Sequence, residues 1–317
     1  MVTRDWLMAI TVAQLRTFMA VARAGSIKLA AAELVVTQPS VSSSIAALER
    51  EIGAKVVERQ GRGIRLSQAG EAFLPFASQV LGLLEDGRAA AVEAANPERQ
   101  ELRIAAVNTA GEHILPPVLH AFRRRYPKIE VYLEISNRAR VFRQVELRDA
   151  DIGIGGSPPE SGELDGVPFL DNRLVVISSP EDPLASRRRL HFGDLEEATW
   201  LLREPGSGTR IFTRRLLDEK GIKPPTMTIG SNGAIKQSVR AGLGISLQSE
   251  RAVALELAMG MLSRLDLAEE IRRREWYALY PGQGPRRSVV DTFLGFLTGT
   301  AAREAIDDSL SAPLEGT

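Results

Sequence analysis

Small polar side chains gather in the stretch LVVTQPSVSSSIAALEREI, between Leu34 and Ile52. They occupy the first turns of an amphipathic helix, although serine and threonine are poor helix formers. Short hydroxyls can reach phosphates and base edges, and a glutamine amide can pair with an adenine edge. These turns therefore have the chemistry of a major-groove contact, supplied by Thr37, Gln38, Pro39, Ser40, Ser42 and Ser43.

A second group of chemically capable residues is the loop REPGSGTR, from Arg203 to Arg210. Its glycines, Gly206 and Gly208, expose backbone N–H groups, Ser207 and Thr209 add hydroxyls, and the two arginines add charge. This combination suits a phosphate, sulfate, sulfonate or carboxylate. The Gly-Lys-Ser/Thr ending of a P-loop and the GxGxxG of a dinucleotide site are absent, so we predict no cofactor.

Two further loops have related chemistry. Asn108, Thr109 and Ala110 follow an apolar strand and open a helix, while Ser231 and Asn232 cap a helix that carries Lys236. Ordinary loop and helix-cap chemistry remains an alternative interpretation of all three loops.

Composition excludes several classes of protein. The chain has 317 residues, which indicates two or three domains. It has no cysteine, and its three histidines are scattered, so neither a disulfide nor a metal site is predicted. No apolar run approaches the length of a membrane span and no signal-peptide pattern is present, which favours a cytoplasmic protein.

The elements around the hydroxyl cluster form a predicted helix-turn-helix. Gly25 ends a first helix, Ser26 caps a second that has a small-residue core, and Thr37 caps the third. Lys55 to Ser67 then predicts a β-hairpin wing with a Gly-Arg-Gly tip. The hairpin and the second helix add Ser26, Lys28, Arg59, Arg62 and Arg65 to the predicted DNA contacts.

Local charge agrees with this interpretation. Residues 1–65 contain nine basic and five acidic residues, whereas Lys+Arg and Asp+Glu are both 40 over the whole chain. A neutral protein thus has a basic first segment, as phosphate binding requires. We expect Arg62→Ala to weaken binding to all DNA sequences and Gln38→Ala to relax sequence preference.

A helix of about 28 residues is predicted after the wing, ending at Asn96-Pro97. It is longer than packing on a small winged domain requires. We interpret residues 68–96 as a linker and dimerisation helix, with a long helix inside one domain as the alternative.

The run AQLRTFMAVARAGSIKLAAAELVVTQPSVSSSIAALEREIGAKVVERQGRGIRLSQAGEAF resembles the N-terminal region of LysR-type transcriptional regulators, nearly without gaps over about seventy residues. The family implies a winged helix-turn-helix at residues 9–67, a pairing linker helix and a C-terminal effector domain. Members often carry Arg, Lys or Gln where this chain has Ser43 and Ser44, which shifts weight to Gln38, the wing and DNA shape.

Strands and helices alternate after Pro97, which predicts an α/β effector domain with a parallel sheet over residues 97–310. The chain crosses to a second subdomain near residue 170 and returns near 275. Subdomain I is therefore assigned to residues 97–170 and 276–310, and subdomain II to residues 171–275.

This region is similar, more loosely, to the two-subdomain effector domain of the same family, which resembles periplasmic solute-binding proteins. The loops look like those of regulators of RuBisCO operons and of sulfur assimilation. The resemblance implies that a small metabolite binds between the subdomains, and the loop chemistry predicts an anion. The predicted effector-binding residues are Asn108, Thr109, Ala110, Asn137, Arg203, Gly206, Ser207, Gly208, Thr209, Ser231 and Asn232.

The leading interpretation is a regulator that binds double-stranded DNA as a homodimer or homotetramer, with RNA polymerase as a further candidate partner and no membrane. One alternative is a metabolite-binding module whose DNA-binding part is vestigial. The other is an enzyme, for which the sequence offers no nucleophile elbow, metal cluster or partnered histidine.

Overall fold

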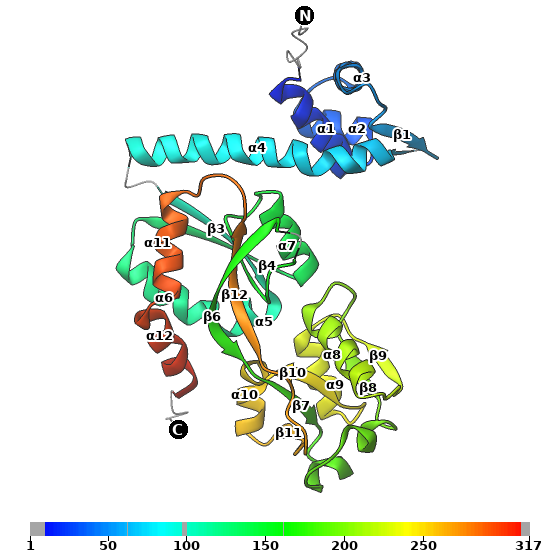
Figure 1. The fold of residues 1–317 in the computed structure, drawn as a ribbon, viewed down its shortest axis with the longest axis vertical. Helices are drawn as coiled ribbons and strands as arrows, with labels where there is room; N and C mark the ends of the chain where they lie inside the picture. Colours follow the sequence, from blue (N-terminus) through cyan, green and yellow to red (C-terminus); the bar gives the residue numbers. More distant parts are fainter. Residues whose placement is uncertain (1–9, 62, 97–99, 161, 312–317) are drawn as a thin grey trace, which may run out of the picture. The chain divides into compact units, whose positions relative to one another are not determined.

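The computed structural model describes residues 10–311, apart from residues 62, 97–99 and 161 (Figure 1). The chain divides into two compact units. The first contains Met1–Ala91 and Glu146–Arg148, and the second contains Val92–Val145 and Asp149–Thr317.

Three short helices form the core of the first unit: α1 (Val12–Ala24), α2 (Ile27–Leu34) and α3 (Gln38–Ile52). Each begins at a polar residue whose side chain accepts from the first turn: Thr11, Ser26 and Thr37. Ala30 and Ala31 are the buried positions of α2, so small side chains allow the helices to approach closely. The predicted helix-turn-helix and its caps are present.

The wing and the long helix follow. Strands β1 (Val57–Gln60) and β2 (Gly63–Leu66) pair in antiparallel, and α4 spans Gln68–Ala95, which is 28 residues. Phe73 of α4 packs on Phe18 of α1 with ring centroids 5.5 Å apart. Further along α4, an apolar stripe is exposed, at Phe76, Val80, Leu83 and Leu84.

A five-stranded sheet organises the first half of the second unit, in the order β4-β3-β5-β12-β6. Helices α6, α11 and α12 lie on one side of it and α7 on the other (Figure 1). Leu102, Ile104 and Ala106 of β3 enter the core on the first side, while Ala105 enters the core on the other. This alternation is the two-residue period of a strand buried on both faces. The bounds are β3 (Gln100–Val107), α5 (Asn108–His113), α6 (Leu115–Arg125), β4 (Ile129–Ser136), α7 (Arg138–Glu146), β5 (Ile152–Gly155), β6 (Leu164–Asn172), β12 (Arg274–Pro281), α11 (Ser288–Leu297) and α12 (Thr300–Ser311).

A smaller three-stranded sheet, β10-β7-β11, organises the other half, beside the parallel pair β8-β9. Its core gathers around Trp200, Leu217 and Ile245. The bounds are β7 (Leu174–Ser178), η1 (Pro183–Ser186), η2 (Phe192–Leu195), β8 (Trp200–Leu202), α8 (Gly208–Glu219), β9 (Thr226–Thr228), α9 (Asn232–Arg240), β10 (Ser246–Ser249), α10 (Glu250–Ala258) and β11 (Ser263–Arg264).

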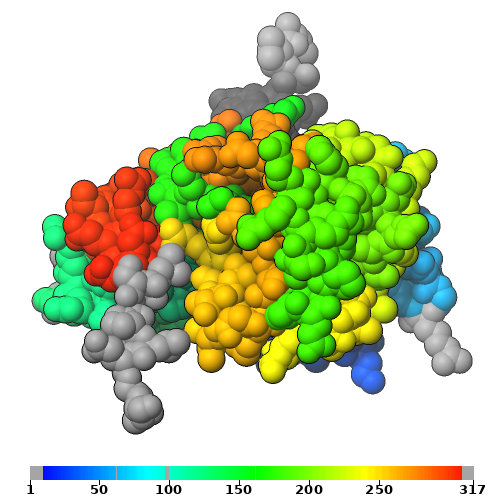
Figure 2. Space-filling view, turned by 90° about the horizontal axis from the view of Figure 1, so that it is seen from below, coloured from blue at the N-terminus to red at the C-terminus, as the bar shows by residue number. Residues whose placement is uncertain are grey.

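The two sheets are joined by two chain segments, which leave β6 after Asn172 and enter β12 at Arg274; we call this place the crossover. The chain leaves the larger sheet at the end of β6 and returns at the start of β12, and Arg274 lies opposite Asn172 in the antiparallel ladder. Figure 2 shows the green surface around residues 160–190 beside the orange surface around residues 265–285. The prediction of a parallel sheet was partly wrong: β4, β3 and β5 are parallel, but β12 is antiparallel to both of its neighbours. The returning strand has no helical crossover before it, so its direction is free.

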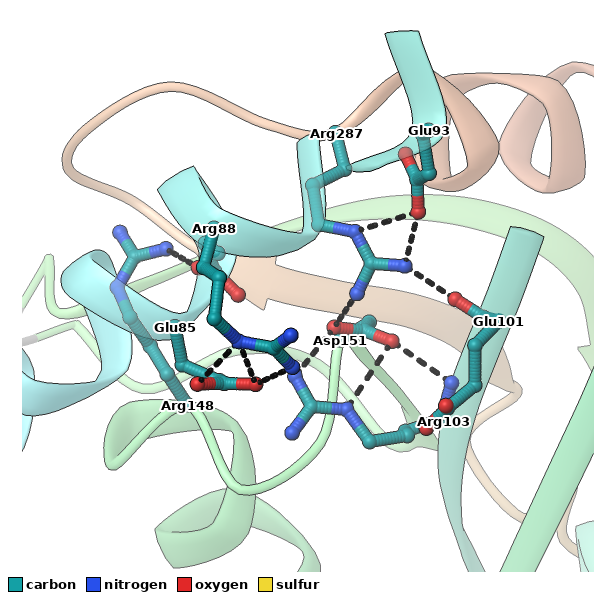
Figure 3. A network of polar contacts seen from close by, with 9 residues as sticks. Glu85, Arg88, Glu93, Glu101, Arg103, Arg148, Asp151 and Arg287 are labelled. Carbon is teal, nitrogen blue, oxygen red and sulfur yellow. Dashed lines mark hydrogen bonds and ion pairs between the residues drawn. The ribbon is translucent and has the colours of Figure 1, made fainter. Parts of the chain in front are cut away.

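A buried ion cluster ties the last turn of α4 to the larger sheet (Figure 3). The Arg287 guanidinium donates to Glu93 Oε1, at 3.1 Å from Nε, to Asp151 Oδ1 at 3.1 Å, and to the Glu101 carbonyl. Arg103 adds a backbone N–H to Asp151 Oδ2 at 2.7 Å. The side chains of Arg287, Glu93 and Asp151 are between 2% and 6% exposed, so this is a paired charge cluster inside the protein.

Candidate functional sites

The hydroxyl cluster lies on the exposed start of α3. Thr37 caps the helix by accepting from the Ser40 N–H at 3.3 Å, and the Thr37 and Ser40 hydroxyls are 2.8 Å apart. Gln38, Ser42 and Ser43 are exposed, whereas Val41, Ile45 and Leu48 face the core. The start of α3 therefore combines free N–H groups with small polar side chains, which is the surface that a major groove accepts.

The other predicted DNA contacts are distributed around this helix start. Pro39, Lys28 and Arg59 are exposed. Ser26 serves as the cap of α2, and Arg65 pairs with Glu58 at 2.6 Å across the wing. Arg62 lies outside the described residues.

A small polar cavity of about 40 Å³ lies between the two sheets of the second unit. It opens at the carboxyl ends of β3, β4, β5 and β8, where ligands of α/β sheets are commonly bound. Seven of the predicted effector-binding residues line it: Asn108, Thr109, Asn137, Arg203, Ser207, Gly208 and Thr209.

Arg203 bridges the two sides of this cavity. Its guanidinium donates to Asn108 Oδ1 at 3.3 Å, to Asn232 Oδ1, and to Glu204 Oε2 at 2.8 Å. Asn232 Nδ2 in turn donates to Thr109 Oγ1 at 3.1 Å. Arg203 is only 4% exposed, and Glu204 balances its charge. The loops after β3 and β8 are thus already held together by hydrogen bonds.

The glycine loop comes very close to the start of α7. Gly206 has φ +88°, and a Cβ there would lie 3.3 Å from the Ala139 Cβ and the Asn137 Nδ2. Its carbonyl accepts from the Ala139 N–H at 3.2 Å. Glycine is therefore required by both conformation and space. The other loop arginine, Arg210, donates to the Arg203 carbonyl at 2.6 Å and so has a structural contact.

Four predicted effector-binding residues do not line the cavity. Gly206 shapes the loop, and Asn232 acts through Arg203 and Thr109. Ala110 is buried in the core, while Ser231 caps α9 by accepting from the Ala234 N–H at 3.1 Å.

Sequence reasoning missed several lining residues. These are Arg138 at the start of α7, and Asn172, Ser249, Arg274 and Trp276 beside the crossover. Arg138 begins α7, and the other four lie in or at the ends of strands rather than in a glycine-rich loop. For Ser249 the available signal was a polar residue at the end of the apolar run GISLQS.

Arg138 and Arg274 contribute two guanidinium groups to the lining of the cavity. Arg274 is half-buried, and its guanidinium has no hydrogen bond or ion pair with the other described residues; the guanidinium carbon lies 5.2 Å from the centre of the Phe212 ring. Burial, with a smaller contribution from the positive charge of Arg138, lowers the pKa of Arg274 to about 10. The charged form is therefore disfavoured, and a bound anion would stabilise it.

Within residues 10–311, leaving aside the undescribed positions, no cluster of three His, Asp or Glu side chains could hold a metal. Over the same residues, no helix has the length and apolar character needed to cross a membrane.

A bacterial regulatory helix-turn-helix model of the lysR family matches residues 12–71, and a LysR substrate binding domain model matches residues 95–302. Together with the winged helix-turn-helix and the two-sheet domain, these matches define a DNA-binding transcriptional regulator with an effector-binding domain. The chain belongs to the LysR family, as its N-terminal motif predicted.

Two relatives within the family indicate which regulators this chain resembles. The transcriptional activator CmpR of Synechocystis sp. is 35% identical over 288 residues, which cover 90% of this chain and 94% of the relative. The RuBisCO operon transcriptional regulator of Allochromatium vinosum is 35% identical over 298 residues, covering 93% and 98%. The predicted resemblance to RuBisCO operon regulators is confirmed.

Among solved structures, the regulatory domain of CcmR from Synechocystis PCC6803, in complex with 2-PG, is 33% identical and has a TM-score of 0.60. The match covers 63% of this chain and 96% of that domain.

Proposed function

We propose that the cavity between the two sheets binds a small anionic metabolite that controls DNA binding. The observation that carries the proposal is the convergence of Arg138, Arg203 and Arg274 with the Ser207–Thr209 loop around one polar cavity. The regulatory domain of CcmR, which is similar to this region, has been solved in complex with 2-PG, and this supports a small-molecule effector. We assign subdomain I to residues 97–170 and 276–310, and subdomain II to residues 171–275.

The size of the cavity indicates how a bound metabolite changes the effector domain. A volume of about 40 Å³ holds about one water molecule, whereas metabolite sites usually span about 300–1,000 Å³. A metabolite must therefore separate the subdomains and compete with the Arg203 bridge to Asn108. The ligand binds only the opened arrangement, and this differential affinity shifts the population of the two states.

The exposed stripe on α4 supports a homodimer. Phe76, Val80 and Leu83 recur at helical spacing, and Phe76 is 66% exposed. A second copy of α4 would bury this stripe in a helix pair. The assembled regulator is then a dimer, or a tetramer built from two dimers.

The DNA interface in this proposal is the start of α3 together with the wing. Gln38, Ser42 and Ser43 read base edges, while Arg59, Arg65 and the amides at the Thr37 cap hold phosphates. The regulator then works in the cytoplasm, bound to double-stranded DNA, with RNA polymerase as a further partner.

Fluorescence anisotropy tests this proposal with the full chain and the DNA beside its own gene, against shuffled DNA, at two salt concentrations. We expect about 10³-fold preference for the native fragment and a steep loss of affinity with salt. Adding 2-phosphoglycolate should shift binding to the native fragment at least three-fold, and Arg274→Ala should abolish that shift. Equal affinity for both DNAs, or no response to any small anion, would contradict the proposal.

Gln38→Ala and Arg59→Ala form a matched pair in the same assay. Gln38→Ala should reduce the preference for the native fragment, and Arg59→Ala should lower the affinity for both DNAs alike. Equal loss on both DNAs for Gln38→Ala would exclude it as a base reader.

A further inference from the structure

The cavity has a second end at the crossover between the sheets. Asn172 is the last residue of β6, Ser249 the last of β10, and Trp276 lies in β12. All three line the cavity, and they are 3%, 5% and 5% exposed. No glycine-rich loop contributes to this end, so its chemistry is separate from that of the Ser207–Thr209 loop.

Polar atoms at this end lack partners. Asn172 Oδ1, Ser249 Oγ and Trp276 Nε1 are buried and have no hydrogen bond with any described residue. Such atoms are rare in native proteins, and each costs free energy unless something binds it. Seven buried side-chain atoms in the described part of the chain lack a partner, and three of them belong to this one small cavity.

Buried residues of the same types outside the cavity have hydrogen-bond partners. Ser246 of β10 is 1% exposed, and its hydroxyl donates to the Leu201 carbonyl at 2.8 Å and accepts from Gln248 at 3.1 Å. The indole N–H of Trp200, fully buried in the second core, donates to the Leu195 carbonyl at 3.3 Å. The unpartnered atoms are therefore a local property of the crossover end.

The charge at this end comes from Arg274, which faces Asn172 in the strand register. Among the described residues, no carboxylate pairs with this guanidinium. The set of groups is thus a cation, an indole N–H donor, a hydroxyl that both donates and accepts, and an amide oxygen that accepts.

We propose that Asn172, Ser249, Arg274 and Trp276 form a second subsite, which takes a carboxylate that bears a neighbouring hydroxyl. The carboxylate accepts from Arg274, Trp276 and Ser249, and the hydroxyl donates to the Asn172 amide oxygen. The effector is then a small two-headed anion: one head lies at the glycine loop and the hydroxycarboxylate lies at the crossover. This inference rests on the proposed effector role of the cavity and adds the class of ligand.

Isothermal titration of the full chain tests the subsite with a graded series of ligands. Methyl phosphate has one anionic head, 2-phosphoglycolate adds a carboxylate, and 3-phosphoglycerate adds a hydroxyl beside the carboxylate. We expect the affinity to rise at each step, by about ten-fold for the carboxylate, which corresponds to about 1.4 kcal/mol of binding free energy.

Two variants remove single polar atoms from the subsite. Ser249→Ala and Trp276→Phe should each lower the affinity for 2-phosphoglycolate and 3-phosphoglycerate about five- to ten-fold and leave the affinity for methyl phosphate unchanged. Ser246→Ala and Trp200→Phe are the matched controls, because they change the same residue types outside the cavity. They should leave all three affinities unchanged.

The possible outcomes distinguish a failure of the proposed subsite from a failure of the proposed effector cavity. If the three ligands bind equally well, or if the subsite variants weaken methyl phosphate as much as the other two, the subsite is wrong and the effector cavity stands. If a ligand-sized anion binds but Ser249→Ala and Trp276→Phe behave like their controls, the subsite is again wrong. If none of the ligands binds, the proposed function of the cavity fails together with it.

Discussion

The Arg287 cluster and the crossover end of the cavity are both buried and polar, but they differ in how their atoms are partnered. Arg287, Glu93 and Asp151 satisfy one another through charge-assisted hydrogen bonds. Asn172, Ser249 and Trp276 leave polar atoms without partners. The first arrangement stabilises one structure, whereas the second leaves polar groups that a ligand can satisfy. Loss of a side chain should therefore affect folding in one region and binding in the other.

The largest expected effect is the loss of Arg287. Arg287→Met leaves Glu93 buried without its cation, while Asp151 keeps only Arg103, and should reduce the free energy of unfolding by about 3–5 kcal/mol. Urea denaturation measures this change. Arg286→Ala is the control, since the Arg286–Asp291 pair is exposed and should contribute less than about 1 kcal/mol. Equal losses of unfolding free energy in the two variants would show that the buried cluster stabilises the protein no more than an exposed ion pair does.

The next effect is at the glycine loop. Gly206→Ala forces a side chain onto a backbone with φ +88° and against Asn137, so it should cost about 1–2 kcal/mol of stability. It should also weaken ligand binding, because the loop carries Ser207 and Thr209. Gly193→Ala has open space at its Cβ and should be neutral or slightly stabilising, as thermal unfolding of both variants can check. Equal melting temperatures would contradict the requirement for glycine.

The relation between sequence and structure differs between the two units. The helices of the first unit could be predicted almost to the residue, because Gly25, Ser26 and Thr37 are local stop and cap signals. The glycine-loop side of the cavity could be predicted for the same reason. The crossover end could not, because Asn172 and Arg274 are far apart in sequence and meet only through strand register. Strand β6 (LDGVPFLDN) was missed too, since its proline and charges hide the apolar pattern.

Stability at acid pH depends on His113. Burial, and next the charge of Lys236, lower its pKa below 6.5, while Glu112 and Glu256 act in the opposite direction. Above pH 6.5 the imidazole is neutral in both the folded and the unfolded chain. Below pH 6.5 the unfolded chain binds the proton first, so stability falls until the pH passes the lower, folded pKa.

Urea midpoints at pH 7.5, 6.5 and 5.5 measure this effect. His113→Gln should flatten the loss of stability between pH 6.5 and 5.5, by at most about 1.4 kcal/mol per pH unit. A pH profile of His113→Gln identical to that of the wild type would exclude His113 as the group involved.

The smallest effect on stability is expected inside the cavity. Ser249→Ala removes a hydroxyl that has no partner, so the free energy of unfolding should change by less than about 0.5 kcal/mol or rise. Ser246, on the same strand as Ser249, has a hydroxyl with two partners, and Ser246→Ala should cost about 1–3 kcal/mol. The difference in free energy of unfolding between these two variants measures directly how a partnered and an unpartnered buried hydroxyl differ.

The most direct test is urea unfolding of the wild type, Ser249→Ala and Ser246→Ala, each with and without 2-phosphoglycolate. Ligand binding raises stability in proportion to the logarithm of ligand concentration over Kd. We predict that Ser249→Ala matches the wild type without ligand and gains less with it, while Ser246→Ala is weaker without ligand and gains the full amount. A Ser249→Ala protein that is destabilised without ligand, yet gains as much as the wild type with it, would contradict the account.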